Sequence, residues 1–450
     1  MSWNDESMAA LFGDTADLNR RRLQCGHHTL WAYSIDGLVQ SSSISDYIFK
    51  PIARDLRADS MTALYRSALA GEIYNAVAVP CKDLPDAASK MVNGFCVVLF
   101  PEVGALAFEV KTGEKRSISA PDLENTAKGA KDGFTETVRT NTGLVRRHLR
   151  SPQLRFYETQ VGTRSQTNVS VVWLEGVTPP NHVTRLIQRL SRLRTDGLLT
   201  PAAVEELVTG ARTTAFPMMQ YTQRTDRFCE GLLGGRVGLF VDGIPLGYLL
   251  PVTLGLLMES MEDYNHDFVT ASAIRILRYA ALLLDLLLPA LYVAMTAYHW
   301  TLLPASLAQV IDQGRQNVPF SPIWEILPLL IAFELLQESG IHLPQSIGQS
   351  VSIIGGIVVG TVGVEAGLIS AVALIAVSTA GVCGFVLPNR DLADAIRVWR
   401  FLLAALAALA GLWGVAAGLL CLLVHLFFLK SLGTPYLRLA RPGILRRRMK

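Results

Sequence analysis

Six small or polar residues in the C-terminal third of the chain have the types and spacing of a water-facing helix surface. At about 100° per residue they fall on one narrow face, while isoleucine and valine cover the rest of the helix. The six are Gln345, Gln349, Ser352, Gly356, Gly360 and Gly363. Side-chain oxygens beside glycines can line an ion path. The same stripe, through its small-xxx-small pair Gly356 and Gly360, can instead let two helices pack closely.

Three carboxylates lie in apolar stretches, where an ionised group is costly. Glu334 and Glu338 are four residues apart, so they share a helix face, and a ring of identical subunits would turn them into a cation-attracting site. Asp285 interrupts another apolar run and must face protein or water. All three are candidates for pore lining or gating. The alternatives are solvated surface acids at Glu334 and Glu338 and a helix-to-helix hydrogen bond at Asp285.

A basic helical stretch within residues 127–154 is a candidate for contacts with other molecules. It ends at Pro152 and could hold anionic lipid headgroups or another subunit. A solvated basic face is the alternative. The arginines concerned are Arg139, Arg146, Arg147 and Arg150.

Composition and motifs argue against several classes of function. The chain has no GxSxG, HExxH, Walker lysine loop or paired Cys/His cluster, and its six cysteines are widely separated. A net charge of +3 is too small to indicate a nucleic-acid binder. We expect no enzymatic activity, no cofactor, no metal site and no nucleic-acid partner. Free thiols fit a reducing compartment.

The candidate residues are carried by apolar segments long enough to cross a membrane. No formal charge occurs between His342 and Glu365 or between Glu365 and Arg390, and a span needs roughly 20 apolar residues. We expect four spans, at 278–299, 345–364, 367–388 and 401–429, with the last as one tilted helix, and a fifth span is the alternative. Residues 323–338 hold three glutamates and a proline, which favours an interfacial, re-entrant or buried helix.

Four spans place the soluble N-terminal region and the basic C-terminal tail on the same side of the membrane. The tail is rich in arginine, and such segments stay in the cytoplasm. The N-terminus lacks an apolar core of signal-peptide length, so we expect the soluble region to be cytoplasmic as well. This topology leaves Arg390, Arg397 and Arg400 in an external loop.

The soluble region contains a repeat. TLWAYSIDGLV at residues 29–39 and VSVVWLEGV at residues 169–177 both end in an acidic residue and glycine before a helical pattern. Further on, NGFCVVLF and GGRVGLFV each lead into a second apolar run. The pair Asp242 and Gly243 indicates a hairpin, so residues 237–258 are expected to form strands, not a span. Two similar α/β or α+β subdomains are the economical explanation.

These patterns divide the chain into five expected parts. They are a first α/β soluble subdomain at 1–111, a linker and basic helix at 112–152, a second α/β soluble subdomain at 153–275, an all-α polytopic membrane domain at 276–430 and a basic cytoplasmic tail at 431–450.

Motifs over nearly the whole length of the chain resemble the A subunits of spore germinant receptors, the GerA family. They include KGAKDGFTETVRTNTGLVRRHLRSPQL, FPMMQYTQRTDRFCEGLLGGRVGLFVDGIP and IAFELLQESGIHLPQSIGQSVSIIGGIVVG. The resemblance implies a multi-pass protein of the spore inner membrane that forms a homo-oligomer and conducts or releases monovalent ions. It also implies a partner membrane sensor subunit and a lipoprotein subunit.

Two alternatives stay open within this resemblance. The short N-terminus does not distinguish a receptor subunit from the close paralogue encoded with the dipicolinic acid channel genes. In the second alternative the protein is a non-conducting scaffold or signal-relay subunit of the same germination complex, and its glycines only pack helices.

Overall fold

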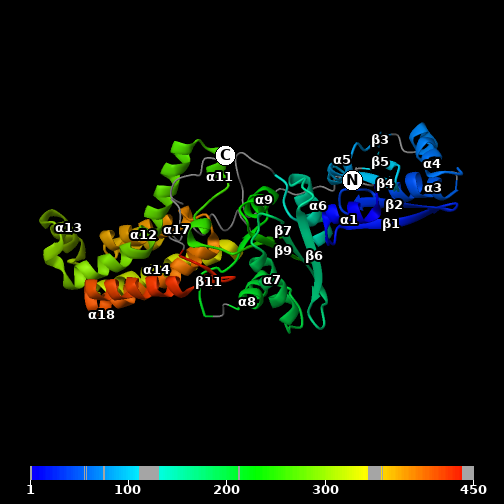
Figure 1. Cartoon of the computed structure of the whole chain (residues 1–450). Helices are drawn as coiled ribbons and strands as arrows, with labels where there is room; N and C mark the ends of the chain where they lie inside the picture. The colour runs from blue at the N-terminus through cyan, green and yellow to red at the C-terminus, as the bar shows by residue number, and fades with distance from the viewer. Residues whose placement is uncertain are drawn as a thin grey trace. The chain divides into compact units, whose positions relative to one another are not determined.

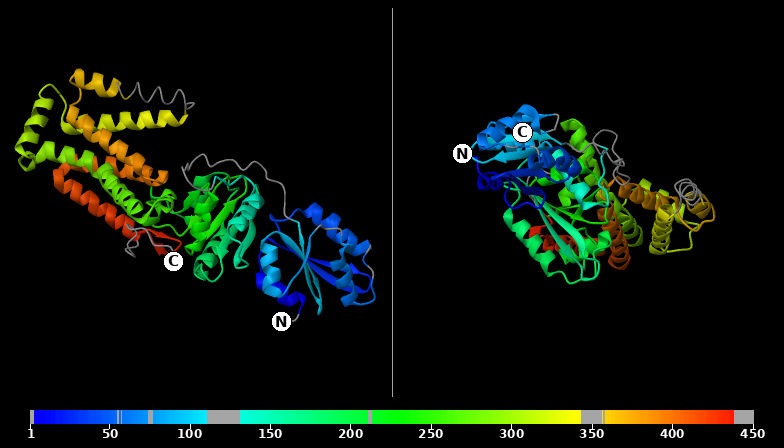
Figure 2. Two further views of the ribbon diagram at one scale, coloured as in Figure 1. Left: turned by 90° about the horizontal axis from the view of Figure 1, so that it is seen from above. Right: turned by 90° about the vertical axis from the view of Figure 1, so that its right-hand side faces the viewer.

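The chain forms two compact units. The computed structural model describes residues 3–54, 56, 58–73, 77–110, 131–210, 213–342, 356 and 358–437. The sheet unit comprises Met1–Arg212 and Met219–Pro251, and the helical unit comprises Thr213–Met218 and Val252–Lys450. Figures 1 and 2 show the chain from three sides. The expected five-part division, with boundaries at 111, 152, 275 and 430, stays a prediction.

The sheet unit contains two five-stranded antiparallel sheets with the same strand order, β1-β2-β4-β5-β3 and β6-β7-β9-β10-β8 (Figure 1). The strands of the first sheet are β1 Leu18–Cys25, β2 His28–Ile35, β3 Ala78–Pro80, β4 Phe95–Phe100 and β5 Gly104–Glu109. Those of the second are β6 Leu154–Val161, β7 Thr167–Leu174, β8 Gln220–Thr222, β9 Val237–Val241 and β10 Gly247–Leu250. Identical strand orders confirm the repeat and the α/β or α+β class.

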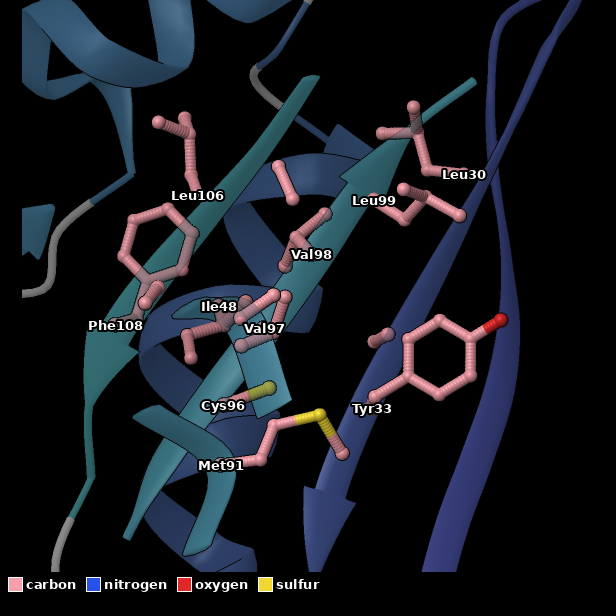
Figure 3. Close-up of a cluster of buried hydrophobic side chains, with 14 of the residues drawn as sticks. Leu30, Tyr33, Ile48, Met91, Cys96, Val97, Val98, Leu99, Leu106 and Phe108 are labelled. Carbon is pink, nitrogen blue, oxygen red and sulfur yellow. The ribbon is translucent and has the colours of Figure 1, made fainter. Parts of the chain in front are cut away.

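The central strands are the ones that the apolar runs indicate. Burial is nearly continuous along β4 and complete along β9, because neighbouring strands and helices cover them. Figure 3 shows part of the first core, with β4 residues beside Tyr33, Met91 and Phe108. Val237–Val241 and Gly247–Leu250 form the expected strands β9 and β10, which pair across the turn at Gly243. The expectation of strands as far as residue 258 is wrong, because Leu254–Leu257 form a helix. The outer strands β1 and β6 were not expected, since four consecutive residues of β1 are exposed and polar.

Helices pack against both sheets and begin at recognisable signals. Asp83 and Thr200 cap α5 and α8, and each helix has a proline in its first turn. The helices beside the first sheet are α1 Asp5–Phe12, α2 Ser41–Ile44, α3 Lys50–Arg54, α4 Met61–Ser67 and α5 Leu84–Val92. Those beside the second are α6 Val138–His148, α7 Pro180–Arg192, α8 Pro201–Thr209 and α9 Thr225–Leu233.

The helical unit is built around α12 Phe268–Tyr298 and α18 Arg390–Phe428. Within the described residues these two are the helices long and apolar enough to cross a membrane, by length and composition. Its shorter elements are α10 Leu254–Leu257, α11 Glu262–Asn265, α13 Ala305–Arg315, α14 Pro322–His342, α16 Gly363–Glu365, α17 Ala371–Val386, β11 Lys430–Ser431 and β12 Thr434–Pro435. Ile326, Leu329 and Leu330 are buried on α14, whereas Trp324 and Leu335 are exposed, and the choice among an interfacial, a re-entrant and a buried helix stays a prediction.

The expectation of one tilted span over 401–429 is wrong, because α18 folds back on itself. Ala410 and Gly411 leave helical geometry, and Gly411 has φ 58°. The rings of Trp399 and His425 lie 5.8 Å apart, whereas an unbroken helix would separate them by roughly 39 Å at about 1.5 Å per residue. α18 is therefore a helical hairpin whose arms are residues 390–409 and 412–428.

The end of the hairpin returns to the beginning of the helical unit. Ser431 Oγ donates to the carbonyl of Met218 over 2.7 Å and accepts from the amide of Val252 over 3.0 Å. The amide of Leu254 donates to the carbonyl of Tyr436 over 3.1 Å. Residues 429–437 thus lie beside the segments that connect this unit to the rest of the chain.

Candidate functional site

One arginine side chain in the helical unit is buried between two carboxylates. Arg400, on the first arm of α18, has a side chain that is only 2% exposed. Its Nη1 donates to Asp285 Oδ1 on α12, and its Nη2 donates to Glu334 Oε1 on α14, each over 2.6 Å. These charge-assisted hydrogen bonds tie three helices together.

The ion pairs continue from this buried centre towards the surface of the helical unit. Arg397, one turn before Arg400, lies 3.4 Å from Glu334 Oε2 and 3.0 Å from Asp394 Oδ1. Side-chain exposure rises from 0% at Asp285 through 25% at Glu334 to 51% at Asp394. The series therefore connects the packed interior to solvent.

An open cleft of about 340 Å³ adjoins the exposed end of this series. The residues that line this charged cleft are Glu334, Glu338, Arg390, Asp394, Arg397, Val398 and Phe401. Carboxylates outnumber guanidinium groups in it, so its potential favours cations over anions.

A seven-residue spacing on α12 puts three of its buried polar side chains on one face. Arg278, Asp285 and Tyr292 are separated by about two helical turns each, and all three are buried. Each meets a different partner. Arg278 Nη1 donates to Asp263 Oδ2 over 2.8 Å, Asp285 binds Arg400, and Tyr292 lies next to α17.

The contact of Tyr292 belongs to a second buried polar cluster at the start of α17. Glu325 Oε1 accepts from the amide of Ser370, the residue that caps α17. Tyr292 Oη lies 3.1 Å from Ser370 Oγ and 3.5 Å from Glu325 Oε2, and Arg315 Nε lies 3.7 Å from the same Glu325 oxygen. A carboxylate at a helix N-terminus is favourable, so Glu325 stabilises the beginning of α17.

Glycines on α17 allow the close approach that buries the Arg400 cluster. A Cβ at Gly381 would overlap the ring of Phe333 on α14, and a Cβ at Gly384 would lie 3.1 Å from Asp285 Oδ2. Glycine at these positions leaves room for the two helices and for the carboxylate.

The structure brings three of the predicted pore or gate residues to one place. Asp285 and Glu334 share Arg400, and Glu338 lines the same cleft. Of the glycine stripe, Gln345, Gln349 and Ser352 lie outside the described residues. Gly356 has open space around its Cα, a Cβ at Gly360 would lie 3.6 Å from Leu374, and one at Gly363 would lie 3.0 Å from Ile369. The pore-lining role of this stripe stays a prediction.

The arginines of the cluster were expected in an external loop, and that expectation is wrong. Helix α18 begins at Arg390, capped by Asn389, and Arg397 and Arg400 lie within it. The signal was present in the sequence, because Leu392, Ile396 and Leu403 recur at helical spacing through the charged stretch. The long apolar run that follows Phe401 is a stronger signal, and it sets the expected start of the helix too late in the sequence.

The predicted basic contact residues occupy unlike environments. Arg146 is completely buried, and its Nε and Nη2 donate to Asp17 over 2.7 and 3.0 Å, so it joins the two subdomains of this chain and is not a surface cation. Arg139 pairs with Asp36 over 2.6 Å, and Arg147 is exposed. Arg150 lies beyond the end of α6 and donates to the side chain of Asn93 over 3.1 Å. A lipid or assembly contact stays a prediction for the exposed members.

Thr225, His148 and Asp132 resemble a catalytic triad in composition but not in geometry. His148 Nε2 lies 2.6 Å from Asp132 Oδ2 and 3.2 Å from Thr225 Oγ1. Both partners use the same ring nitrogen, whereas a triad needs one at each nitrogen. The arrangement is an ion pair that ties the start of the second subdomain to α6 and α9. No group of three metal-ligating side chains occurs among the residues that the structure describes.

This ion pair makes the stability of the sheet unit depend on pH. The hydrogen bond to Asp132 raises the pKa of His148, and the bond to His148 lowers the pKa of Asp132 to about 2. A raised histidine pKa gives stabilisation that is complete below the ordinary value of 6.5 and is lost as pH rises through the folded value. A lowered aspartate pKa gives stabilisation that is present above 3.8 and is lost as pH falls towards 2.

We therefore expect the contribution of this pair to be largest between pH 3.8 and pH 6.5. Raising the pH from about 5.5 to about 8.5 should cost the wild-type chain roughly 0.2–1 kcal/mol more than a His148→Gln variant. Urea unfolding of the full chain in detergent, followed by tryptophan fluorescence, measures the difference. An unchanged pH dependence in the variant would contradict the assignment.

The sequence of this chain is similar to those of known proteins. Residues 6–448 match the family described as Bacillus/Clostridium GerA spore germination protein. The membrane protein YfkQ of Bacillus subtilis (strain 168) is 35% identical over 437 residues, 96% of this chain and 85% of that protein. Spore germination protein KA of the same organism is 30% identical over 429 residues, 94% of this chain and 79% of that protein.

A solved structure also matches part of the chain. It is the N-terminal domain of the A subunit of the Bacillus megaterium spore germinant receptor GerK3, at 22% identity and a TM-score of 0.42. The match covers 54% of this chain and 91% of that one.

Proposed function

The chain belongs to the Bacillus/Clostridium GerA family of spore germination proteins, and from this premise we propose that it is a membrane subunit of a spore germinant receptor. It acts in germination as an oligomeric ion-conducting or ion-release component, gated by nutrient sensing in a partner subunit. The partners are a membrane sensor subunit and a lipoprotein subunit, and the ions are monovalent.

The observation that carries this proposal is the buried Asp285–Arg400–Glu334 cluster. Asp285 lies on α12, a helix long and apolar enough to cross a membrane, and Arg400 lies on the first arm of the apolar α18 hairpin. Ionisable residues within membrane segments are costly and rare, and they mark ion or proton pathways in channels and transporters. An open, acidic cleft beside the cluster supports access by cations.

The proposed location is the spore inner membrane, with the N-terminal region and the C-terminal tail in the cytoplasm. The hydrogen bonds of Ser431 and Tyr436 to residues 218, 252 and 254 support this topology. These hydrogen bonds hold the segment that follows α18 beside the segments that precede α12. In the proposed topology the chain returns to the side from which it entered.

Ion flux through the purified oligomer, reconstituted in vesicles, tests the proposal. We expect Gln349→Leu and Gly356→Leu to lower the monovalent cation flux at least tenfold while the oligomer stays intact, because a bulky apolar side chain would obstruct a hydrated path. Gly314→Leu is the control, since Gly314 on α13 is exposed and has open space around it.

A non-conducting scaffold or signal relay is the second candidate, favoured by the close packing of Gly381 against Phe333. In that case the variants at 349 and 356 would disrupt assembly, and the wild-type oligomer would carry no flux above empty vesicles.

A further inference from the structure

We propose that Arg400 is the gate at which cations enter the ion path from each subunit, between the charged cleft and Asp285. This inference rests on the proposed ion-conducting function and adds the gating group and the ion-binding carboxylates. It places the gate between α12, α14 and the first arm of α18, and it leaves the lining of the remaining path to the glycine stripe.

Arg400 occupies the position that a dehydrated cation would take. Its guanidinium lies between Asp285 Oδ1 and Glu334 Oε1, 2.6 Å from each. In this arrangement the positive charges of Arg397 and Arg400 balance the negative charges of the two carboxylates. Removing the guanidinium leaves one uncompensated negative charge between two carboxylates, which is the electrostatic requirement of a monovalent cation site.

Two buried polar atoms of the Asp285–Arg400–Glu334 cluster have no hydrogen-bond partner among the described residues, so a second arrangement of these side chains could satisfy them better. Asp285 Oδ2 and Arg400 Nε have no hydrogen-bond partner among the described residues, although their side chains are 0% and 2% exposed. Buried polar atoms without partners are uncommon and call for an explanation. A Cβ at position 384 would lie only 3.1 Å from Asp285 Oδ2, so glycine is needed there for the carboxylate to fit. An entering cation or water molecule would satisfy this oxygen.

The charged cleft lies next to the cluster. Glu334 is shared between the charged cleft and Arg400, so the Nη2–Oε1 hydrogen bond separates solvent from Asp285. Arg397 holds the other oxygen of Glu334 and keeps this carboxylate in place when Arg400 moves. Rotation of the Arg400 side chain away from Glu334 would break this hydrogen bond and open the cleft towards Asp285.

Flux of potassium ions from vesicles that contain the full-length chain tests the gate. We expect Arg400→Gln to raise basal flux about tenfold or more, Arg400→Lys to keep it near the wild-type level, and Asp285→Asn added to Arg400→Gln to abolish the increase. Glu334→Gln, at the partly exposed end, should raise basal flux less than Arg400→Gln does. Lys430→Gln removes an exposed cation elsewhere in the helical unit and should change nothing.

Size-exclusion chromatography checks the assembly of each variant, and Glu334→Gln keeps the test decisive if Arg400→Gln does not fold. The gate is overturned if the wild type conducts but folded Arg400 and Glu334 variants have unchanged basal flux. If the wild-type chain carries no flux under any condition, the proposed function itself fails and the gate fails with it.

Discussion

Replacing Arg146 with alanine lowers the free energy of unfolding of the sheet unit by about 3–5 kcal/mol, because a buried charge pair then loses one partner. Arg146 is 0% exposed, and Asp17 is 3% exposed. The guanidinium also donates to the carbonyls of Ser151 and Leu154 over 2.7 and 2.9 Å. The variant leaves a carboxylate and two carbonyl groups without these donors in the interior.

The pair matters beyond its own energy because it joins the two subdomains. Asp17 precedes β1 of the first sheet, and the adjoining Thr15 and Ala16 form hydrogen bonds with Phe156 on β6 of the second. Gly143 on α6 supports the same contact, since a Cβ there would lie 2.9 Å from the carbonyl oxygen of Gly37. Loss of Arg146 should therefore separate the unfolding of the two subdomains into two transitions.

Calorimetry or urea unfolding of the full chain measures this effect. Arg147→Ala is the matched control, because Arg147 is exposed on the same helix and should cost at most about 0.5 kcal/mol. The double variant Arg146→Met with Asp17→Leu should be less destabilised than either single variant, since no charge is then left alone. Equal unfolding energies for the variants at 146 and 147 would show that the pair does not hold the subdomains together.

Leucine at position 414 prevents the α18 hairpin from closing. A Cβ on Gly414 would overlap the backbone carbonyl of Leu406 on the opposite arm, and the next contact along the pair is Gly418 against the side chain of Leu403. Backbone cannot move aside as a side chain can, so the cost should reach or exceed the roughly 3 kcal/mol at the upper end of overpacking effects. The arms should separate.

Crosslinking detects the separation directly. Cysteines placed at 399 and 425, in a chain whose six native cysteines are replaced, should react with a short bifunctional thiol reagent, because the native rings lie 5.8 Å apart. Gly414→Leu should reduce the yield at least fivefold, and Ala417→Leu, on the exposed side of the same arm, should not. Efficient crosslinking in both variants would show that the arms tolerate the added bulk.

Much of the sheet unit follows from local patterns in the sequence. The runs NGFCVVLF and GGRVGLFV are continuous because their strands lie at the centre of a covered sheet, and the turn at Asp242 and Gly243 ends one of them. Repeated spacing between such runs predicted two similar subdomains. The outer strands escaped because a half-exposed strand such as LNRRRLQC has few apolar residues to reveal it.

Partners far apart in the sequence could be found only in the tertiary structure. The sequence by itself determined an apolar C-terminal region and two related sheets. It also singled out Asp285, Glu334 and Arg146 as charged residues with a candidate function. Tertiary structure decided that Asp285 and Glu334 share Arg400, that Arg146 is buried against Asp17, and that α18 reverses at Gly411. Periodicity reports the environment of one helix or strand, whereas the pairing of charges depends on which elements pack together.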